Sequence, residues 1–527
     1  MPIPKLSLCV LTLAVAASAA ESAIWKVAPP PPASWQAGRV ADLAARRKAV
    51  IDQIGDHSVL VLYAAEARNY AKDVNWPYRQ ENNFFYLTGL TQADATLVLI
   101  PGAAKMREIV FIPHANPARE TWTGHMLTPD EVRQTSGIQD VFESSQLNGM
   151  LSALVPRARS ILTTNEMPGA GRGGRAGAIA AAPVDSPIWS IEIAQPIAYA
   201  AQENLQLYLV LPARLNAVEY RREQEFAGKL ASVGAGLTIK DATLIFDKLR
   251  RVKSPRELDL LQHAVDITAE AFQRAYAYAV PGTPEYEIQA QFEFTFLRRN
   301  AHWGYPCIVG SGVNATTLHY ESNKDTMKDG DLILMDDAAE FDQYSVDVTR
   351  TIPVNGKFTK EQAEIYRLVW DAQQAGFSKA KPGHPASDIQ GAANEVFKQR
   401  LFALGLITDA TSDAQMKVWS IHGISHGIGL NVHDPDGREL QPGMTITVEP
   451  GLYFRPDALD NLPKTPEMEK FKEAVRPAFE KYKGIGVRIE DDVVITNGEP
   501  KVISAGIPSK LEEIEATIAK LRAAAKN

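Results

Sequence analysis

The sequence predicts a mixed α/β chain with two domains, the second built from two similar halves that share an antiparallel sheet. Three observations lead to this prediction. Helix-like and strand-like apolar patterns alternate in the first half of the 527 residues, a strong helix start follows at Ser254, and a Pro-Gly-x-Pro motif occurs twice further on. A chain of this length can hold two or three domains of ordinary size.

The first residues have the pattern of a secretory signal. Lys5 precedes an apolar run over residues 6–16, and the small residues 17–19 follow it. The run is too short to span a bilayer. We therefore expect a signal peptide over residues 1–19, a proline-rich linker over residues 20–36, and a periplasmic or secreted mature protein. An N-terminal anchor that is not cleaved, or a frayed helix, is the alternative.

The charge balance limits which partners the protein can bind, and the cysteine content limits disulfide formation. The 55 basic and 63 acidic residues give a net charge of −8, so we expect no binding to nucleic acid and none to an anionic membrane after signal cleavage. A peptide or another small substrate is the better expectation. Signal cleavage removes Cys9 and leaves Cys307 as a lone core thiol, so that an intrachain disulfide cannot form.

The first domain is expected over residues 37–250. Apolar residues recur at helical spacing from Val40 to Ile54, and three apolar runs read as buried strands, at residues 58–63, 84–88 and 96–100. A tract rich in Gly, Ala and Arg over residues 169–177 is typical of a flexible loop, and we assign no function to it.

The second domain is expected over residues 251–527. Ser254, Pro255 and Glu257 form an N-cap, a first-turn proline and a capping box, which together predict a long helix ending before Pro281. The motif at residues 281–284 recurs at residues 382–385, each time between two helical patterns. Two related units of two helices followed by strands predict two halves facing a shared cleft, where ligand sites tend to lie. Two coincidental Pro-Gly turns are the alternative.

Two aspartates mark a predicted hairpin in the first half. An apolar strand runs into Asp336, turns through polar residues, and returns through Asp347 into Thr349-Arg350-Thr351. Adjacent buried carboxylates repel each other, so that a bound cation would explain them. The hairpin alone is equally compatible with a turn aspartate at position 336 and an ion pair between Asp347 and Arg350.

The second half adds three metal-ligand residue types. His426 lies in His-Gly-Ile-Ser-His-Gly, and Glu449 and Glu490 each end an apolar strand run. This donor set suits hard or borderline divalent ions, with Mn²⁺ preferred and Zn²⁺ or Co²⁺ as alternatives. Four carboxylates and one imidazole carry too much negative charge for one ion and suit two. Paired ions roughly 3.5–4 Å apart can activate a water for hydrolysis.

These motifs resemble the pita-bread metallopeptidases, and specifically aminopeptidase P (Xaa-Pro aminopeptidase). The resemblance includes Asp347-Val-Thr-Arg-Thr, Val-Glu449-Pro-Gly-Leu-Tyr and Gly-Val-Arg-Ile-Glu490-Asp-Asp. The stretches at residues 77–89 and 308–320 are also similar to the family, so the likeness covers nearly all of the chain after the signal segment.

The resemblance implies a dinuclear manganese site and a proline-specific exopeptidase. Asp347 and Glu490 would bridge the ions, Asp336 would complete one, and His426 and Glu449 the other. Glu449 would also accept a proton from the attacking water. Peptides with proline in second position would lose their N-terminal residue, and the enzyme would form dimers or tetramers. Four further residues match groups that line the substrate cleft, the first two of them with catalytic roles: His319, His433, His422 and Arg488.

Each cleft residue also has a structural interpretation. His319 could be a packed loop residue and His422 a strand residue bonded to backbone, while His433 could pair with Asp434 and Arg488 with Glu490.

The sequence departs from the family pattern at three places. Asp337 adds an acid beside the metals, which is expected to pair with a base or to face solvent, and Asn431 replaces a commonly acidic residue. Residues 454–483 form a longer connection than expected, with a helix capped by Thr465. We expect a solvated surface helix there, with a lid or a subunit contact as the alternative.

Two other functions fit the same fold. A prolidase shares the ligands but accepts only Xaa-Pro dipeptides, and the ligand spacing does not separate it from aminopeptidase P. A metal-free pita-bread protein, whether a binding module or a creatinase, would have lost ligands, whereas all five are present here.

Overall fold

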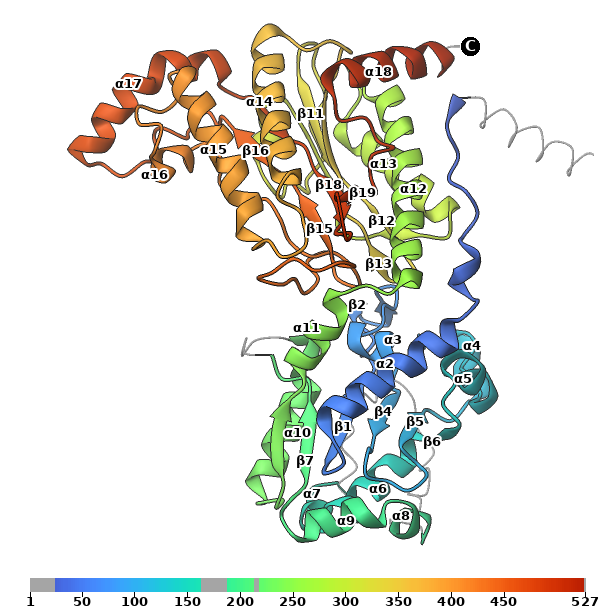
Figure 1. The fold of residues 1–527 in the computed structure, drawn as a ribbon. Helices are drawn as coiled ribbons and strands as arrows, with labels where there is room; N and C mark the ends of the chain where they lie inside the picture. Colours follow the sequence, from blue (N-terminus) through green and yellow to red (C-terminus); the bar gives the residue numbers. More distant parts are fainter. Residues whose placement is uncertain (1–23, 163–186, 213–217, 526–527) are drawn as a thin grey trace, which may run out of the picture. The chain divides into compact units, whose positions relative to one another are not determined.

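The computed structural model describes residues 24–162, 187–212 and 218–525 (Figure 1). The chain forms two compact units, Gln36–Leu249 and Arg250–Asn527, and the described part of the N-terminal segment up to Trp35 belongs to the second. The predicted signal peptide and the tract at residues 169–177 lie outside the described residues. Within the described ranges, no helix combines the length and apolar character needed to cross a membrane.

The first unit is built on a mixed six-stranded sheet with the order β6-β5-β4-β1-β7-β8. The central strand β1 pairs antiparallel with β4 and parallel with β7. The strands of this sheet are β1 (Ser58–Tyr63), β4 (Thr96–Leu99), β5 (Glu108–Ile112), β6 (Asp140–Glu143), β7 (Gln206–Leu209) and β8 (Thr238–Asp241). A separate hairpin is formed by β2 (Asn69–Ala71) and β3 (Val74–Asn75).

Both faces of this sheet are buried. Val59 and Val61 join a core cluster with residues of the helices that follow β6, among them Leu154 and Trp189. Leu60 and Leu62 are equally buried but point to the other face, because side chains alternate along a strand. The helices of this unit are α2 (Arg39–Ile54), α3 (Asn82–Thr88), α4 (Pro117–Thr123), α5 (Pro129–Ser136), α6 (Leu147–Leu154), α7 (Arg159–Leu162), α8 (Pro187–Glu192), α9 (Ala194–Ala201), α10 (Arg221–Ser232) and most of α11 (Thr243–Arg251).

The predicted strand at residues 84–88 is wrong, because these residues lie in helix α3. The Glu81 side chain caps the helix by accepting a hydrogen bond from the Phe84 amide (2.6 Å), and Gly89 ends it with a positive φ of 64°. Residues 83–88 are all buried, so the apolar run carries no period that distinguishes a buried helix from a buried strand.

The second unit has two pairs of helices over short antiparallel strand groups, as Figure 1 shows in green and yellow for the first half and in orange and red for the second. The first half has α12 (Pro255–Tyr278), α13 (Glu285–Arg298), β9 (His302–Trp303), β10 (Ile308–Ser311), β11 (Leu332–Asp336), β12 (Ala339–Phe341), β13 (Tyr344–Ser345) and β14 (Thr349–Pro353). The second half has α14 (Lys360–Phe377), α15 (Ser387–Ala403), α16 (Asp413–Met416), β15 (Thr445–Val448), β16 (Gly451–Tyr453), α17 (Pro466–Tyr482), β17 (Gly486–Arg488), β18 (Asp491–Val494), β19 (Lys501–Val502) and α18 (Leu511–Ala525).

The two Pro-Gly-x-Pro turns occupy equivalent places in the two halves. Gly282 and Gly383 both have positive φ (92° and 80°), and each donates its amide to a carbonyl on the returning chain, that of Met327 (2.8 Å) and that of Leu440 (2.9 Å). The structure therefore confirms the predicted repeat. The capping box predicted at Ser254 is also present at the start of α12.

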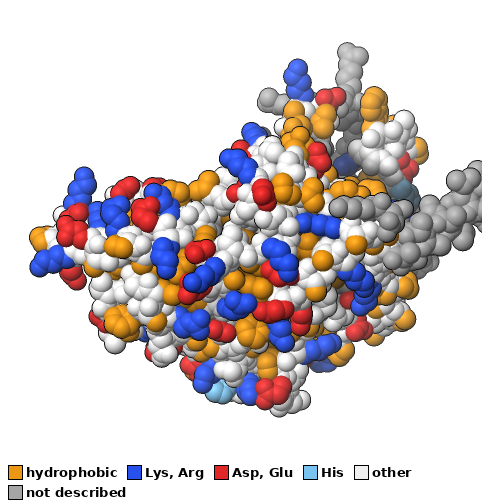
Figure 2. Space-filling model, turned by 90° about the horizontal axis from the view of Figure 1, so that it is seen from above, with side chains coloured by type: hydrophobic (Ala, Val, Ile, Leu, Met, Phe, Trp, Pro, Cys, Tyr) orange, Lys and Arg blue, Asp and Glu red, His pale blue; other side chains and the backbone are white. Residues whose placement is uncertain are grey.

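Residues 454–483 leave β16 and return to β17 by way of helix α17. The helix lies at the left end of Figure 1, and the same end in Figure 2 carries both acidic and basic side chains. One face is buried from Phe471 onward, through Phe471, Val475, Phe479 and Tyr482, while most other residues of the helix are exposed. Helix α17 is therefore a solvated surface helix, as expected, that packs on the unit by one face.

Candidate metal centre

The two aspartates of the first half meet at one end of the antiparallel strand pair β11 and β14. Asp336 is the last residue of β11 and pairs with Thr349, and Asp347 lies two residues before Thr349. The hydroxyl of Tyr305 lies 2.6 Å from Asp336 Oδ1 and 2.7 Å from Asp347 Oδ1. The hairpin thus brings both carboxylates together, as its sequence predicts, and the structure adds one phenol between them.

The glutamates of the second half meet in the same way. Strands β15 and β18 pair antiparallel with Val448 opposite Asp491, so that Glu449, after β15, and Glu490, before β18, lie at one end of the pair. The Glu490 amide donates to the Thr349 carbonyl (3.1 Å), which joins this end to the first half.

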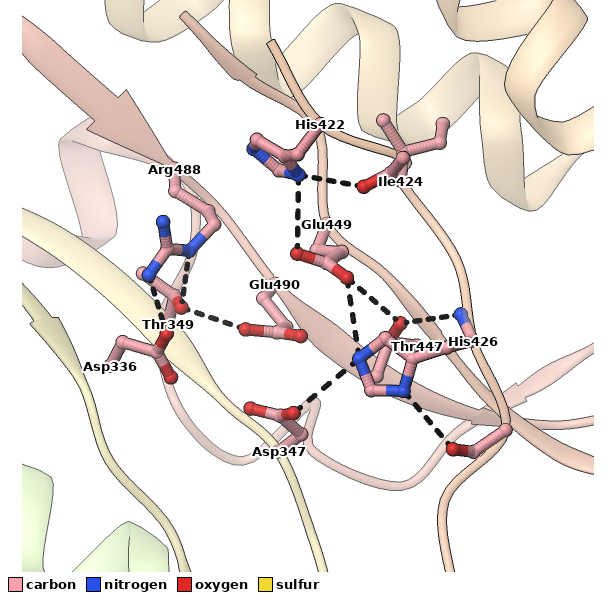
Figure 3. Close-up of polar contacts among 12 residues, drawn as sticks. Asp336, Asp347, Thr349, His422, Ile424, His426, Thr447, Glu449, Arg488 and Glu490 are labelled. Carbon is pink, nitrogen blue, oxygen red and sulfur yellow. Dashed lines mark hydrogen bonds and ion pairs between the residues drawn. The ribbon is translucent and has the colours of Figure 1, made fainter. Parts of the chain in front are cut away.

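His426 completes the cluster from the loop before β15 (Figure 3). Its Nε2 lies 3.3 Å from Glu449 Oε1 and 3.5 Å from Asp347 Oδ2. Backbone and side-chain bonds to Thr447 fix this loop, because His426 N donates to Thr447 Oγ1 (3.1 Å) and Thr447 N donates to the His426 carbonyl (2.9 Å). Asp347, His426 and Glu490 offer ligand atoms that all lie within 4.8 Å of one another.

The charge of the cluster fits bound cations. Burial raises the pKa of Asp347 and of Glu490 well above the ordinary values, and the charges of neighbouring carboxylates add to this rise. Burial acts to lower the pKa of His426, but hydrogen bonding and charge from Glu449 raise it to about 9. Four carboxylates and one imidazole around a buried point are the oxygen-rich donor set that divalent ions prefer. The residues present therefore fit divalent metal ions.

Arg488 and His422 lie beside the cluster and are joined through a tyrosine. Arg488 is buried and donates to Asp336, to Thr349 Oγ1 (2.9 Å) and to the hydroxyl of Tyr453 (2.9 Å). The Tyr453 hydroxyl lies 2.8 Å from His422 Nε2, and His422 Nδ1 lies 3.6 Å from Glu449. A pairing of Arg488 with Glu490 alone is therefore wrong, because the guanidinium bonds three other side chains.

His433 and His319 are exposed. The His433 ring stacks on His426, with ring centres 3.9 Å apart, and burial followed by the charge of His426 lowers the pKa of His433. The charge of His319 also acts on the pKa of His433. His433 does not pair with Asp434, whose carboxylate instead accepts from Arg250 and Lys253.

Tyr305 and Tyr453 are contacts that the sequence does not reveal. Tyr305 stands alone in the sequence, and Tyr453 ends the Val-Glu-Pro-Gly-Leu-Tyr motif, but neither position indicates which groups its hydroxyl contacts. Burial is the main reason for the raised pKa of both phenols, so they act as neutral hydrogen-bonding groups; that of Tyr453 is about 12.

The prediction that Asp337 pairs with a base or faces solvent is wrong. Its side chain is fully buried, and among the described residues it forms no ion pair with a base; its neighbours are the Cys307 thiol and the Ala338 amide. Burial raises its pKa well above the usual value. Asp337 lies between β11 and β12, and its side chain is in the core near Cys307. Asn431 accepts a hydrogen bond from Arg250 (2.5 Å).

Two parts of the chain match known protein families. Residues 259–497 match metallopeptidase family M24, and residues 43–162 match the aminopeptidase P N-terminal domain. Fold and site thus define a two-domain metallopeptidase with a pita-bread catalytic domain.

Individual relatives narrow the class. The chain is 31% identical to the Xaa-Pro aminopeptidase of Escherichia coli K12, and the match covers 90% of this chain and 97% of that protein. It is also 31% identical to mouse Xaa-Pro aminopeptidase 3, and that match covers 87% of this chain and 80% of the mouse protein. A solved aminopeptidase of Pseudomonas aeruginosa superposes with a TM-score of 0.73 at 31% identity, covering 92% of this chain and 99% of that one. The chain belongs to the Xaa-Pro aminopeptidase family and is a metalloaminopeptidase.

Proposed function

We propose that this enzyme releases the N-terminal residue from peptides whose second residue is proline, with the help of two divalent ions. The observation that carries the proposal is the single cluster formed by Asp336, Asp347, His426, Glu449 and Glu490, which come from both halves of the catalytic unit. Relatives along nearly the whole chain bear the name Xaa-Pro aminopeptidase, which supports the substrate class.

The donor set supports two ions, with manganese first. Asp336, Asp347 and Glu490 would hold one ion, and Asp347, Glu490, His426 and Glu449 the other. When bound, such ions supply positive charge that acidifies an attacking water and polarises the peptide carbonyl. Oxygen ligands with one imidazole favour Mn²⁺, although a zinc-substituted form of the Escherichia coli enzyme has been solved.

The remaining groups supply proton transfer and orientation. The Glu449 carboxylate lies between His426 and His422, which places a base at the centre of the cluster. His319 and His433 offer exposed imidazoles, which would hydrogen-bond the peptide around the scissile bond. Arg488 holds Asp336 and Tyr453 in fixed positions.

We further propose that the mature enzyme is periplasmic or secreted and assembles as a dimer or tetramer. Support for export comes from the apolar run at residues 6–16 and the small residues after it. Support for assembly is the family resemblance. N-terminal sequencing of protein made in a diderm host should begin near Ala20, and sedimentation should give a mass above one chain. A cytosolic protein that retains Met1 contradicts export.

The decisive experiment compares two substrate lengths. Hydrolysis of an Xaa-Pro dipeptide and of a longer Xaa-Pro-Xaa peptide is measured after chelation and after addition of Mn²⁺. We expect activity on the longer peptide that is lost on chelation and restored by Mn²⁺, with about two ions per chain at saturation. Cleavage confined to dipeptides identifies a prolidase, and full activity in metal-free protein refutes the proposal.

A further inference from the structure

The chain between the two glutamate strands contains an inserted helix, α17, whose buried face reaches the segment that carries His422. We propose that Trp419 and Phe479 are positioning residues: through them, the inserted helix holds His422 in place for substrate. The inference rests on the proposed function, because it takes His422 to be a residue of the substrate cleft.

Trp419 is fully buried and is held on three sides. Its ring stacks on Phe479 of α17, with centres 5.5 Å apart and planes at 27°, and also contacts Phe454, at 5.2 Å and 33°. The indole N–H donates to the Leu406 carbonyl (2.8 Å), which fixes the rotation of the ring in its own plane. Stacked aromatic rings favour particular offsets, so Phe479 sets the place of Trp419 more narrowly than an aliphatic contact would.

Trp419 is connected to His422 by Tyr453. The Tyr453 amide donates to the Trp419 carbonyl (2.9 Å), and the Tyr453 hydroxyl lies 2.8 Å from His422 Nε2. Both ends of the segment Trp419–His422 are therefore tied to one tyrosine. Since that hydroxyl also accepts from Arg488 (2.9 Å), a shift of Trp419 would disturb both His422 and the guanidinium beside the metal carboxylates.

The base of the insertion is closed tightly around the same strands. Phe454 N donates to the Ile485 carbonyl (2.9 Å), and Gly484 N donates to the Phe454 carbonyl (2.7 Å). Tyr482 packs on Phe454, with ring centres 5.7 Å apart, and its hydroxyl donates to Glu364 of α14 (2.6 Å). Helix α17 is thus docked at its end on both the strand pair and α14.

The competing explanation is that α17 only adds stability. The helix itself offers a matched control, because Phe471 is also a buried phenylalanine on the same face but has no ring contact with Trp419. Replacing either phenylalanine by alanine removes a similar buried side chain, so both variants should lose thermal stability. A positioning role adds an effect that Phe479→Ala alone shows.

The test compares Phe479→Ala, Phe471→Ala and Phe479→Leu in the full-length protein. For Phe479→Ala, we expect KM for an Xaa-Pro-Xaa peptide to rise about 10-fold, the lower end of the losses caused by removing outer partners of a site. We expect its kcat to fall less than KM rises, and its metal content to match the wild type. Phe471→Ala should keep the wild-type KM, and Phe479→Leu, which restores most of the volume, should recover most of the affinity.

Two further readouts do not depend on turnover. Binding of the dipeptide Pro-Leu, which resembles a product beginning with proline, should weaken in Phe479→Ala by the same factor as KM rises. In metal-free protein, amide hydrogen exchange over residues 419–424 should be faster in Phe479→Ala than in the wild type. It should stay unchanged in Phe471→Ala.

An unchanged KM in folded Phe479→Ala, or an equal rise in Phe471→Ala, overturns the inference. If the wild type cleaves no Xaa-Pro peptide, the proposed function fails. In that case hydrogen exchange still decides whether Phe479 holds the segment: faster exchange in Phe479→Ala alone supports this, and unchanged exchange overturns it.

Discussion

Glu223 of helix α10 is a carboxylate that the first unit buries without adequate partners. Only 2% of the residue is exposed, and its Oε2 has no hydrogen-bond partner among the described residues. Burial raises its pKa to about 8; nearby Glu81 and Glu66 add to the rise, and Arg222 opposes it. We predict that Glu223→Gln stabilises the first unit at alkaline pH.

The size and sign of the effect follow from proton linkage. Below the ordinary pKa of 4.5, the carboxyl is protonated in both the folded and the unfolded chain, and the pH dependence vanishes. Between 4.5 and about 8 the unfolded chain releases this proton while the folded chain keeps it, so the wild type loses stability as the pH rises. At 1.36 kcal/mol per pKa unit, the full loss is about 5 kcal/mol as an upper limit. Glutamine has no proton to release and avoids the loss.

The assay is urea titration at pH 5 and pH 8.5, followed by hydrogen exchange of the β1 and α10 peptides. These peptides report on the first unit separately from the catalytic unit. Glu225→Gln on the same helix is the matched control, because its side chain is 46% exposed. We expect Glu223→Gln to gain free energy of unfolding over the wild type as the pH rises, and Glu225→Gln to show no such trend. A gain that is equal at both pH values, or no gain, refutes the reasoning.

Three other predictions concern the catalytic unit. Tyr305→Phe removes the hydroxyl that both proposed metal-binding aspartates share, so metal affinity or activity should fall roughly 10–100-fold in metal titration and kinetics, with the fold unchanged by circular dichroism. Glu449→Gln should weaken metal binding and lower kcat by more than the ~10²–10⁴-fold typical of losing a general acid or base. His433→Ala should lower kcat/KM while the metal content stays normal. An equal loss of metal in both variants contradicts the division into metal ligands and substrate-binding groups. Burial lowers the pKa of His263, whose ring nitrogens have no hydrogen-bond partner in the described chain. Because the unfolded chain then binds a proton more readily than the folded chain, the protein should lose stability as the pH falls below 6.5. Melting curves at pH 5.5 and 7.5 should show that His263→Leu removes this loss.

Local rules predicted the parts of the fold that local residues determine. The capping box at Ser254 and the paired turns at Gly282 and Gly383 depend on short-range hydrogen bonds and backbone conformation, which the sequence displays directly. The helix at Phe84 was not predictable in this way, since burial on every side removes the apolar period.

The candidate site also contains residues that the sequence reveals and residues that only the folded structure reveals. A carboxylate that ends an apolar strand is conspicuous, so Asp336, Glu449 and Glu490 can be found from the sequence. Tyr305 is a single tyrosine before a strand, and only the folding of the Asp336 hairpin against it makes it a partner of the metal carboxylates. The burial of Asp337, which lies between β11 and β12, is likewise evident only once the core packed around it is known.

The proposed metal ligands are divided unequally between the two repeated halves. The first half supplies Asp336 and Asp347, and the second supplies His426, Glu449 and Glu490. A chain cut at the turn around Gly356, between β14 and α14, would give two fragments of which neither has a full ligand set. Fragment complementation would therefore restore tight metal binding only when the halves reassociate, and bound metal would act as a reporter of their docking that needs no substrate.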